Sequence, residues 1–235
     1  MADVMQKLNL IPNDGGGAGR VRRANLVQIL KAAEQVFAES GFTGATMAEI
    51  AERADLPKAN LHYYFGTKED LYRAVLANVL DMWKPPISAI RTDADPAQAI
   101  AEYVYAKMEL SRTRPCASRV FANEILHGAT QIGGFLSHDL NPIIEEKSAI
   151  LESWIAQGKM APVDPKSFFF MIWAMTQHYA DFEAQIRVVL GKKQLTKKDF
   201  AHFTQEVIRS VLRVAGLAPV SFCGVENPQP LDPGV

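Results

Sequence analysis

The sequence predicts an all-α protein, with an N-terminal helix-turn-helix domain of three helices and a larger helical domain after it. Apolar residues recur at helical spacing along most of the 235 residues, and no alternating pattern typical of strands occurs. One stretch, Thr46–Phe65, has the pattern of two short helices separated by a tight turn. We expect the first domain at residues 20–84, with the helix-turn-helix at residues 46–65, and the second domain at residues 85–216.

The two ends of the chain lack helical periodicity. Residues 1–19 contain Gly15, Gly16 and Gly17, and we expect a disordered arm there. Residues 217–235 carry several prolines, and we expect a disordered tail. The folded part of the protein is therefore expected between these two segments.

The composition is that of an ordinary soluble protein, with 48% apolar and 22% charged residues. Because the net charge is only −1, any binding to nucleic acid must come from a local patch. Cys116 and Cys223 are too few for a disulfide framework or a thiolate metal site, which fits a reducing compartment. The most apolar run, Phe168–Met175, is too short to span a membrane. We expect a cytoplasmic protein without a membrane partner.

Apolar residues between Leu26 and Phe37 form one stripe, which predicts an amphipathic first helix. Gly41 is placed to end that helix in the left-handed conformation. Three arginines precede the stripe: Arg20, Arg22 and Arg23. They could follow phosphates or enter a minor groove, or they could simply begin a solvated helix.

The helix after the helix-turn-helix has clear signals at both ends. Thr67 can cap it, and acidic residues follow in the first turn, where the helix dipole favours them. Trp83 lies on its apolar side. We expect Pro85 and Pro86 to end it, because proline lacks the amide donor that a helix interior needs.

Within Thr46–Phe65, the spacing of apolar residues predicts that one face of each helix is buried. The apolar face of the first helix consists of Met47, Ile50, Ala51 and Ala54. Pro57 interrupts this pattern and suits the first position of a second helix. The second helix turns Leu61, Tyr64 and Phe65 inward. Its outward face is small, polar and aromatic, and consists of Ala59, Asn60, His62 and Tyr63.

An outward face of this kind is typical of a helix that reads DNA. A major groove admits an α-helix, and short side chains of that helix can contact base edges and thymine methyls. In a helix-turn-helix the first helix crosses the phosphate backbone and the second lies in the groove. We expect DNA contacts from Thr46, Lys58, Ala59, Asn60, His62, Tyr63 and Lys68. The alternative is a surface helical hairpin whose polar side chains merely lie in solvent.

The rest of the chain reads as a series of helices. We expect them from Pro96 to near Pro115, around Val120, from Phe135 to Gln157, from Pro165 onward and from Thr196 to Ala215. The run Phe168–Met175 is nearly all apolar and should be buried on every side. Pairing two of these helices across a twofold axis would give a four-helix homodimer interface. The same axis would present two recognition helices to successive major grooves, so we expect a palindromic operator in double-stranded DNA.

A polar cluster lies at the end of the most apolar helix, and its members are Thr176, Gln177, His178 and Asp181. Trp173 and Gln177 share one face because they are four residues apart. The cluster could bond internally, since buried polar groups need partners. It could also orient a ligand, since pockets combine aromatic walls with a few polar groups. The pattern alone allows both.

The run Gly41–Leu76 combines several distinctive features. They are a Gly-Phe-Thr start, T-x-x-x-I-A in the first helix, Leu-His-Tyr-Tyr-Phe at the end of the second, and K-E-x-L afterwards. With these features it resembles the DNA-binding domain of the TetR family of bacterial repressors. It departs from the family at Asp55, where glycine is usual, and at Pro57, where serine or threonine is usual. The resemblance implies a TetR-like fold and a ligand-responsive transcriptional regulator, expected to act as a repressor.

A closer resemblance covers residues from about Trp83 to Phe182. It rests on the stretches LDMWKPP, ASRVFANEIL, EEKSAILESWIAQGKMAPVDP and MIWAMTQHYADF. These are similar to TetR-family regulators of pyrimidine utilisation, which sense uracil and thymine. The resemblance implies a pyrimidine pocket lined by Trp83, Trp173 and Gln177, with His178 and Tyr179 nearby. It implies no cofactor. A TetR-family repressor that responds to a different aromatic or lipophilic molecule is the alternative.

Two other functional classes lack their motifs. Glu124, His138, His178 and Asp181 could be assembled into an acid-base group, but no nucleophile elbow, phosphate loop or zinc-protease helix accompanies them. His178 and Asp181 are three residues apart and could share a metal ion, but two ligands do not complete a site. We therefore expect no catalytic and no metal-binding residues.

Overall fold

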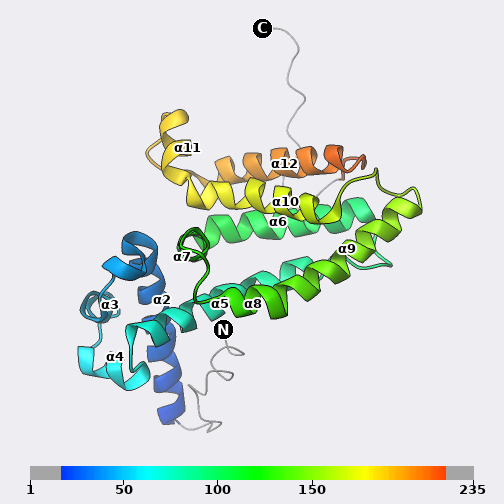
Figure 1. The fold of residues 1–235 in the computed structure, drawn as a ribbon. Helices are drawn as coiled ribbons and strands as arrows, with labels where there is room; N and C mark the ends of the chain where they lie inside the picture. The colour runs from blue at the N-terminus through cyan, green and yellow to red at the C-terminus, as the bar shows by residue number, and fades with distance from the viewer. Residues whose placement is uncertain (1–16, 221–235) are drawn as a thin grey trace. The chain divides into compact units, whose positions relative to one another are not determined.

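The computed structural model describes residues 17–220, and every regular element in that range is a helix (Figure 1). The chain forms two compact units. Within the described residues, the N-terminal unit contains residues 17–87 together with Thr113–Ile143, and the C-terminal unit contains Ser88–Arg112 together with residues 144–220. The predicted all-α class is confirmed. The expected boundary at residues 84 and 85 differs from this division, because residues 113–143 pack with the N-terminal helices.

The N-terminal unit is built from α2 (Gly17–Gly44), α3 (Met47–Arg53), α4 (Lys58–Tyr64), α5 (Lys68–Ile87), α7 (Pro115–Leu126), α8 (Gly133–Phe135) and the π-helical turn η1 (Leu136–Leu140). Helix α2 begins at Gly17, so residues 17–19 of the expected arm are helical, while residues 1–16 lie outside the described range. The core of the unit is formed by fully buried apolar side chains: Leu26, Ile29, Val36, Ile50, Leu61 and Leu71. Helix α7 packs beside α2 and α5.

Gly41 marks the place where the path of α2 changes direction. Its φ of 66° and ψ of 177° are not helical, and φ lies in the left-handed region that glycine adopts without a steric penalty. On either side of Gly41, the rings of Phe37 and Phe42 both pack on Tyr72 of α5, with centroids 4.9 Å apart in each pair. This aromatic cluster fixes the direction in which the chain leaves α2 and enters α3.

Helix α5 is longer than the sequence predicted. Thr67 caps it as expected, because its Oγ1 accepts the Asp70 N–H at 3.1 Å. The expectation that Pro85 and Pro86 end the helix is wrong, since both lie inside its last turn and the helix ends at Ile87. A proline costs most in a helix interior, where an i to i−4 hydrogen bond is lost, and least where the helix is about to end.

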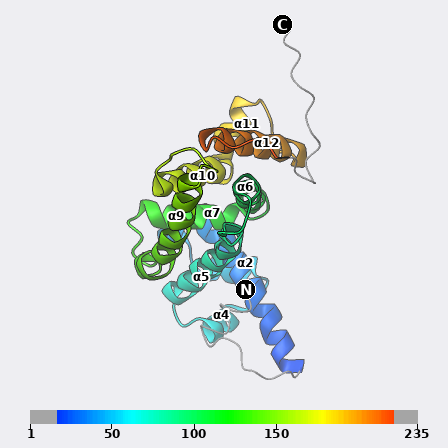
Figure 2. The ribbon, with the colours of Figure 1, turned by 90° about the vertical axis from the view of Figure 1, so that its right-hand side faces the viewer.

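The C-terminal unit contains α6 (Pro96–Thr113), α9 (Asn141–Ala156), α10 (Pro165–Asp181), α11 (Glu183–Val189) and α12 (Lys197–Val214). Helix α10 lies beside both α6 and α12 (Figures 1 and 2). Asp164 caps α10 through a 2.8 Å bond from the Ser167 N–H, and Thr196 begins α12 with a capping box. Apolar side chains without exposed surface form the core: Ile100, Val104, Met108, Leu151, Trp154, Phe169, Ile172 and Val211.

Three features of this part of the chain differ from the sequence prediction. Helix α10 is not buried on every side, because Phe170 is 56% exposed within the single chain. Helix α11 was not expected, since its short run follows α10 directly at Phe182 without a separating turn signal. The helix expected from Phe135 to Gln157 is interrupted by η1.

Candidate DNA interface and effector-binding residues

The predicted helix-turn-helix is present as α3 and α4. Thr46 caps α3, since its Oγ1 accepts the Glu49 N–H at 3.1 Å. Pro57 directly precedes α4 instead of forming its first residue. The Gln28 amide on α2 donates to the Ala54 carbonyl oxygen at 2.5 Å. The start of the turn is therefore held by a side chain of α2 as well as by the backbone bonds of the turn itself.

Asp55 occupies a backbone conformation in this turn that favours glycine. Its φ is 49°, in the left-handed region, and its side chain is exposed. For residues with a β-carbon this conformation is costly, although aspartate tolerates it better than most. The family's usual glycine is thus replaced by aspartate at a position where the backbone adopts a positive φ.

Helix α4 presents the predicted reading face to solvent. Leu61 and Phe65 are 0% and 3% exposed and fix the opposite side of α4 to the core. The residues expected to contact DNA on the outward side are all exposed: Lys58, Ala59, Asn60, His62 and Tyr63. With α3 capped at Thr46 and α4 held to the core by Leu61 and Phe65, this face is open to solvent.

Lys68, which the sequence predicts to contact DNA, also has partners within the protein. Its Nζ donates to the Phe42 carbonyl oxygen at 2.7 Å and to the Ala45 carbonyl oxygen at 3.0 Å. It also lies 4.6 Å from the centroid of the Phe42 ring, within the range of a cation-π interaction. Two of the three ammonium donors therefore connect α5 to the last turn of α2, at Phe42, and to Ala45 directly after α2.

Arg22 is a functional candidate that the sequence did not distinguish from its neighbours Arg20 and Arg23. Its Nη1 lies 3.5 Å from the Tyr63 hydroxyl, and its guanidinium carbon lies 5.5 Å and 5.8 Å from the rings of Tyr63 and Tyr64. Asn25, one turn further along α2, donates to the Tyr64 hydroxyl at 3.4 Å. The start of α2 thus supports the aromatic end of α4, and it brings a positive charge to the reading face.

Trp83 lies on α5 in the N-terminal unit. Its ring packs edge-to-face on Phe121 of α7, with centroids 4.3 Å apart and an interplanar angle of 74°. The side chain is half-buried. This contact fixes the plane of the indole, which is what a residue that stacks on a flat ligand requires.

Trp173 and Gln177 lie on α10 in the C-terminal unit. The Trp173 indole N–H donates to the Tyr103 hydroxyl on α6 at 2.7 Å. Gln177 is half-buried one turn later on the same side of α10. Thr176 is fully buried and bonds internally, because its hydroxyl donates to the Ile172 carbonyl oxygen at 2.8 Å. Tyr103 was not identified as a candidate from the sequence, because its partner Trp173 is 70 residues away.

His178 and Tyr179 have different neighbours from Trp173. The His178 ring stacks on Phe182 at 4.9 Å, and the Tyr179 ring stacks on Phe203 of α12 at 4.7 Å. Burial raises the pKa of Tyr179, and the charge of Glu206 raises it further. The structure therefore places this pair in an aromatic cluster with α12, whereas Trp173 bonds to α6.

Two family models match consecutive parts of the chain. The model described as "Bacterial regulatory proteins, tetR family" matches residues 29–75, and the model described as "YcdC-like protein, C-terminal region" matches residues 76–218. The HTH-type transcriptional regulator RutR of Escherichia coli strain K12 is 46% identical over 192 residues, which cover 82% of this chain and 89% of RutR. The chain belongs to the TetR family. It is a transcriptional regulator of the TetR type, and regulators of this type bind DNA and dimerise.

Other TetR-type relatives are more distant. The HTH-type transcriptional repressor NicS of Pseudomonas putida is 36% identical over 132 residues, which cover 56% of this chain and 61% of NicS. The crystal structure of a HlyIIR mutant protein has a TM-score of 0.61 at 22% identity, covering 80% of this chain and 97% of that one. A TetR-like regulator from Rhodococcus sp. RHA1 has a TM-score of 0.60 at 20% identity, covering 81% and 94%. These two structures support the fold alone.

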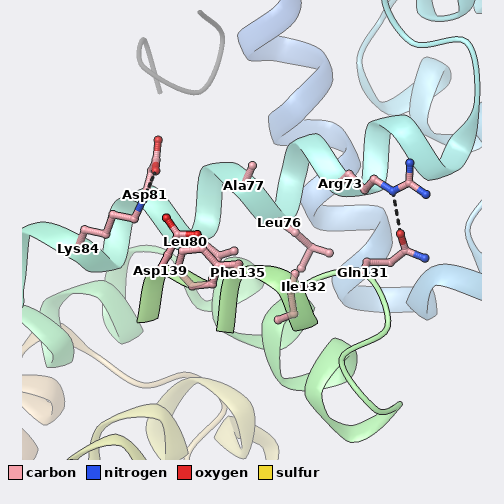
Figure 3. A pocket seen from close by; sticks show the side chains of 10 residues that line it. All are labelled: Arg73, Leu76, Ala77, Leu80, Asp81, Lys84, Gln131, Ile132, Phe135 and Asp139. Atoms are coloured by element: carbon pink, nitrogen blue, oxygen red, sulfur yellow. Dashed lines mark hydrogen bonds and ion pairs between the residues drawn. The ribbon is translucent and has the colours of Figure 1, made fainter. Parts of the chain in front are cut away.

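A groove of about 340 Å³ in the N-terminal unit contains none of the predicted effector residues of this TetR-type regulator (Figure 3). It lies between α5 and the segment from Gln131 to Asp139. Arg73 Nε donates to Gln131 Oε1 at 2.8 Å, and Lys84 pairs with Asp81 at 3.2 Å. The two basic side chains of the groove thus already have partners, Arg73 in Gln131 and Lys84 in Asp81. We therefore assign the groove no ligand.

Of the four residues that suggested an acid-base group, Glu124 has a structural role and the two histidines lie on the surface. Glu124 is 5% exposed and accepts the Tyr72 O–H at 3.1 Å and the Gln131 N–H at 2.6 Å. Burial raises the pKa of Tyr72, as does the charge of Glu124. His138 and His178 are exposed.

Residues 17–220 contain no group of three side chains that could hold a metal ion, and no helix in that range is long and apolar enough to cross a membrane.

Proposed function

We propose that this TetR-type regulator controls genes of pyrimidine-base metabolism, and that uracil or thymine modulates its binding to a palindromic operator. The observation that carries the proposal is the 46% identity to RutR, which extends over 82% of this chain and so includes regulatory helices as well as the reading helix. The sequence resemblance to regulators of pyrimidine utilisation includes the stretch MIWAMTQHYADF of α10, which holds Trp173 and Gln177.

The DNA-binding part of the proposal uses the exposed face of α4. Asn60 and His62 would contact base edges, and Ala59 and Tyr63 would contact methyl groups and sugars. Thr46 and Lys58 would contact phosphates, because capped helix starts and free cations bind them. A homodimer would place two such faces in successive major grooves.

The effector part of the proposal uses complementary hydrogen bonding. The Gln177 amide offers one acceptor and two donors, which complement an imide N–H beside a carbonyl oxygen. The Trp173 ring, oriented by Tyr103, suits stacking on a flat base. We place His178 and Tyr179 outside the direct contacts, because their rings stack on Phe182 and Phe203.

The test is fluorescence anisotropy of labelled DNA from upstream of the protein's own gene, over a salt series, with uracil, thymine or cytosine added. We expect salt-dependent binding that uracil or thymine changes and cytosine does not. Calorimetric titration of uracil into the Gln177→Ala variant should show weaker binding than the parent, while Gln194→Ala, an exposed control, should not. If the protein binds the operator and no pyrimidine changes that binding, the DNA-binding part of the proposal stands and the pyrimidine effector is refuted.

A lipophilic effector is the second candidate, because the C-terminal unit holds an apolar groove of about 280 Å³. It lies between α10, α11 and α12 and is lined by His178, Gln185, Ile186, Val189, Leu190 and Phe203. The same anisotropy assay with aromatic and acyl compounds in place of uracil separates the two candidates. A response to such compounds that is lost in Phe203→Ala and kept in Gln177→Ala would favour this groove.

A further inference from the structure

Helix α6 carries a polar stripe inside the C-terminal unit. Tyr103, Lys107 and Ser111 are spaced one turn apart and are 3%, 5% and 4% exposed. Their neighbours Val104 and Met108 have no exposed surface. Polar side chains at three successive inward positions are uncommon in a core, because each must find partners away from water.

The stripe faces the part of α10 on which the effector proposal rests. Tyr103 accepts the Trp173 indole N–H at 2.7 Å, and the Ser111 hydroxyl donates to the Thr176 carbonyl oxygen at 2.8 Å. These two bonds pin α6 to α10 on either side of Lys107 along the stripe. The Lys107 side chain therefore starts from the stretch of α6 that is bonded to the Trp173–Thr176 turn of α10.

Lys107 is the member of the stripe whose burial costs most. Burial lowers the pKa of Lys107 to about 8, while the charge of Asp181 on α10 acts in the opposite direction. A buried cation is retained when a function or a partner requires it, since an apolar side chain of similar length would pack there at less cost. An ammonium group has three donors, so it can serve a carboxylate and a ligand oxygen together.

We propose that Lys107 is a contact residue of the effector site, and that its ammonium group donates a hydrogen bond to a carbonyl oxygen of a planar cyclic imide held by Trp173 and Gln177. This inference rests on the proposed function and deepens it. Tyr103 is a positioning residue, because its hydroxyl fixes the plane of the Trp173 ring. A donor at this place selects a ligand with a carbonyl oxygen over one that presents an amino group, which would leave two donors facing each other.

The first test compares uracil binding by the full-length parent, Lys107→Met and Lys198→Met. Lys198 is an exposed lysine of α12 and serves as the matched control. We expect Lys107→Met to bind uracil about 10- to 100-fold more weakly, the range for losing one hydrogen bond to a charged group. It should still bind operator DNA without ligand, which confirms that it is folded. Uracil affinity within twofold of the parent would overturn the role of Lys107 and leave the proposed function standing.

A second test needs no variant and so holds even if Lys107→Met fails to fold. The parent protein is titrated with 2-thiouracil and 4-thiouracil, in which sulfur, a weaker acceptor, replaces one carbonyl oxygen. We expect one of the two analogues to bind clearly more weakly than uracil. If both bind as tightly as uracil, the contact with Lys107 is refuted. If the parent binds neither uracil nor thymine, the proposed function fails and this inference fails with it.

Discussion

Replacing Lys68 with methionine separates two roles for this residue, a clamp inside the protein and a contact to DNA phosphate. The ammonium group donates to two backbone carbonyls, at 2.7 Å and 3.0 Å, and lies over the Phe42 ring. Methionine keeps most of the length of the side chain and removes all three interactions. The clamp role predicts that the N-terminal unit loses stability.

The size of the loss follows from the geometry. Hydrogen bonds to a charged group contribute about 1.5–3 kcal/mol each when buried. Lys68 is only half-buried, and water can replace it at the Phe42 and Ala45 carbonyls, so we expect about 2 kcal/mol in total, including about 0.5 kcal/mol from the ring contact. For a protein of this size that corresponds to a fall in Tm of about 4–8 °C.

The assay combines urea unfolding with operator binding at several salt concentrations. Lys58→Met is the control, because Lys58 lies exposed on the reading face. It should change the free energy of unfolding by less than about 0.5 kcal/mol while lowering the salt slope of binding by about one for each phosphate that it no longer neutralises. If Lys68→Met instead leaves unfolding unchanged and lowers the salt slope, Lys68 contacts phosphate and the clamp is not its role.

Three further predictions concern single positions. Asp55→Gly should raise the free energy of unfolding by about 0.5–1 kcal/mol, because φ at this exposed position is 49°; a lower urea midpoint would contradict it. Arg22→Leu should weaken operator binding about 3- to 10-fold, since it removes a charge and the support of Tyr63, and Arg23→Leu should weaken it less; equal effects would show that only charge matters. Because burial lowers the pKa of Lys107 to about 8, below its value in the unfolded chain, the unfolded state binds more protons between about pH 8 and 10.5, so stability should rise with pH in that window. Urea midpoints of the parent and Lys107→Met measured across the window should show a rise that the variant lacks, and parallel curves would refute this.

Much of the fold and of the reading face could be predicted because the signals are local. Thr67 caps α5 as expected, and the bond joins residues three positions apart, as do the caps at Thr46, Asp164 and Thr196. Helical spacing also assigned Leu61 to the core and Tyr63 to the surface, which the structure confirms. The DNA contacts of these exposed side chains stay a prediction.

The limits of prediction are clearest at Pro85 and Pro86 and in α10. Local rules placed the end of α5 at the prolines, but the helix tolerates them in its last turn. The apolar run of α10 suggested burial on every side, yet Phe170 is 56% exposed. An apolar run predicts that its side chains will be buried. It does not predict which helix of the same chain, or which other chain, will cover them.

The sequence by itself determined the all-α class, the helix-turn-helix and the side of α4 that faces solvent. Only the tertiary structure decided that Lys68 bonds to carbonyls 23 and 26 residues away, that Arg22 supports Tyr63 across 41 residues, and that Tyr103 orients Trp173 across 70. The physical reason is the range of the interactions. Periodicity and capping act within a turn of helix, whereas a side chain's partner on another helix depends on how the helices cross, which periodicity does not encode.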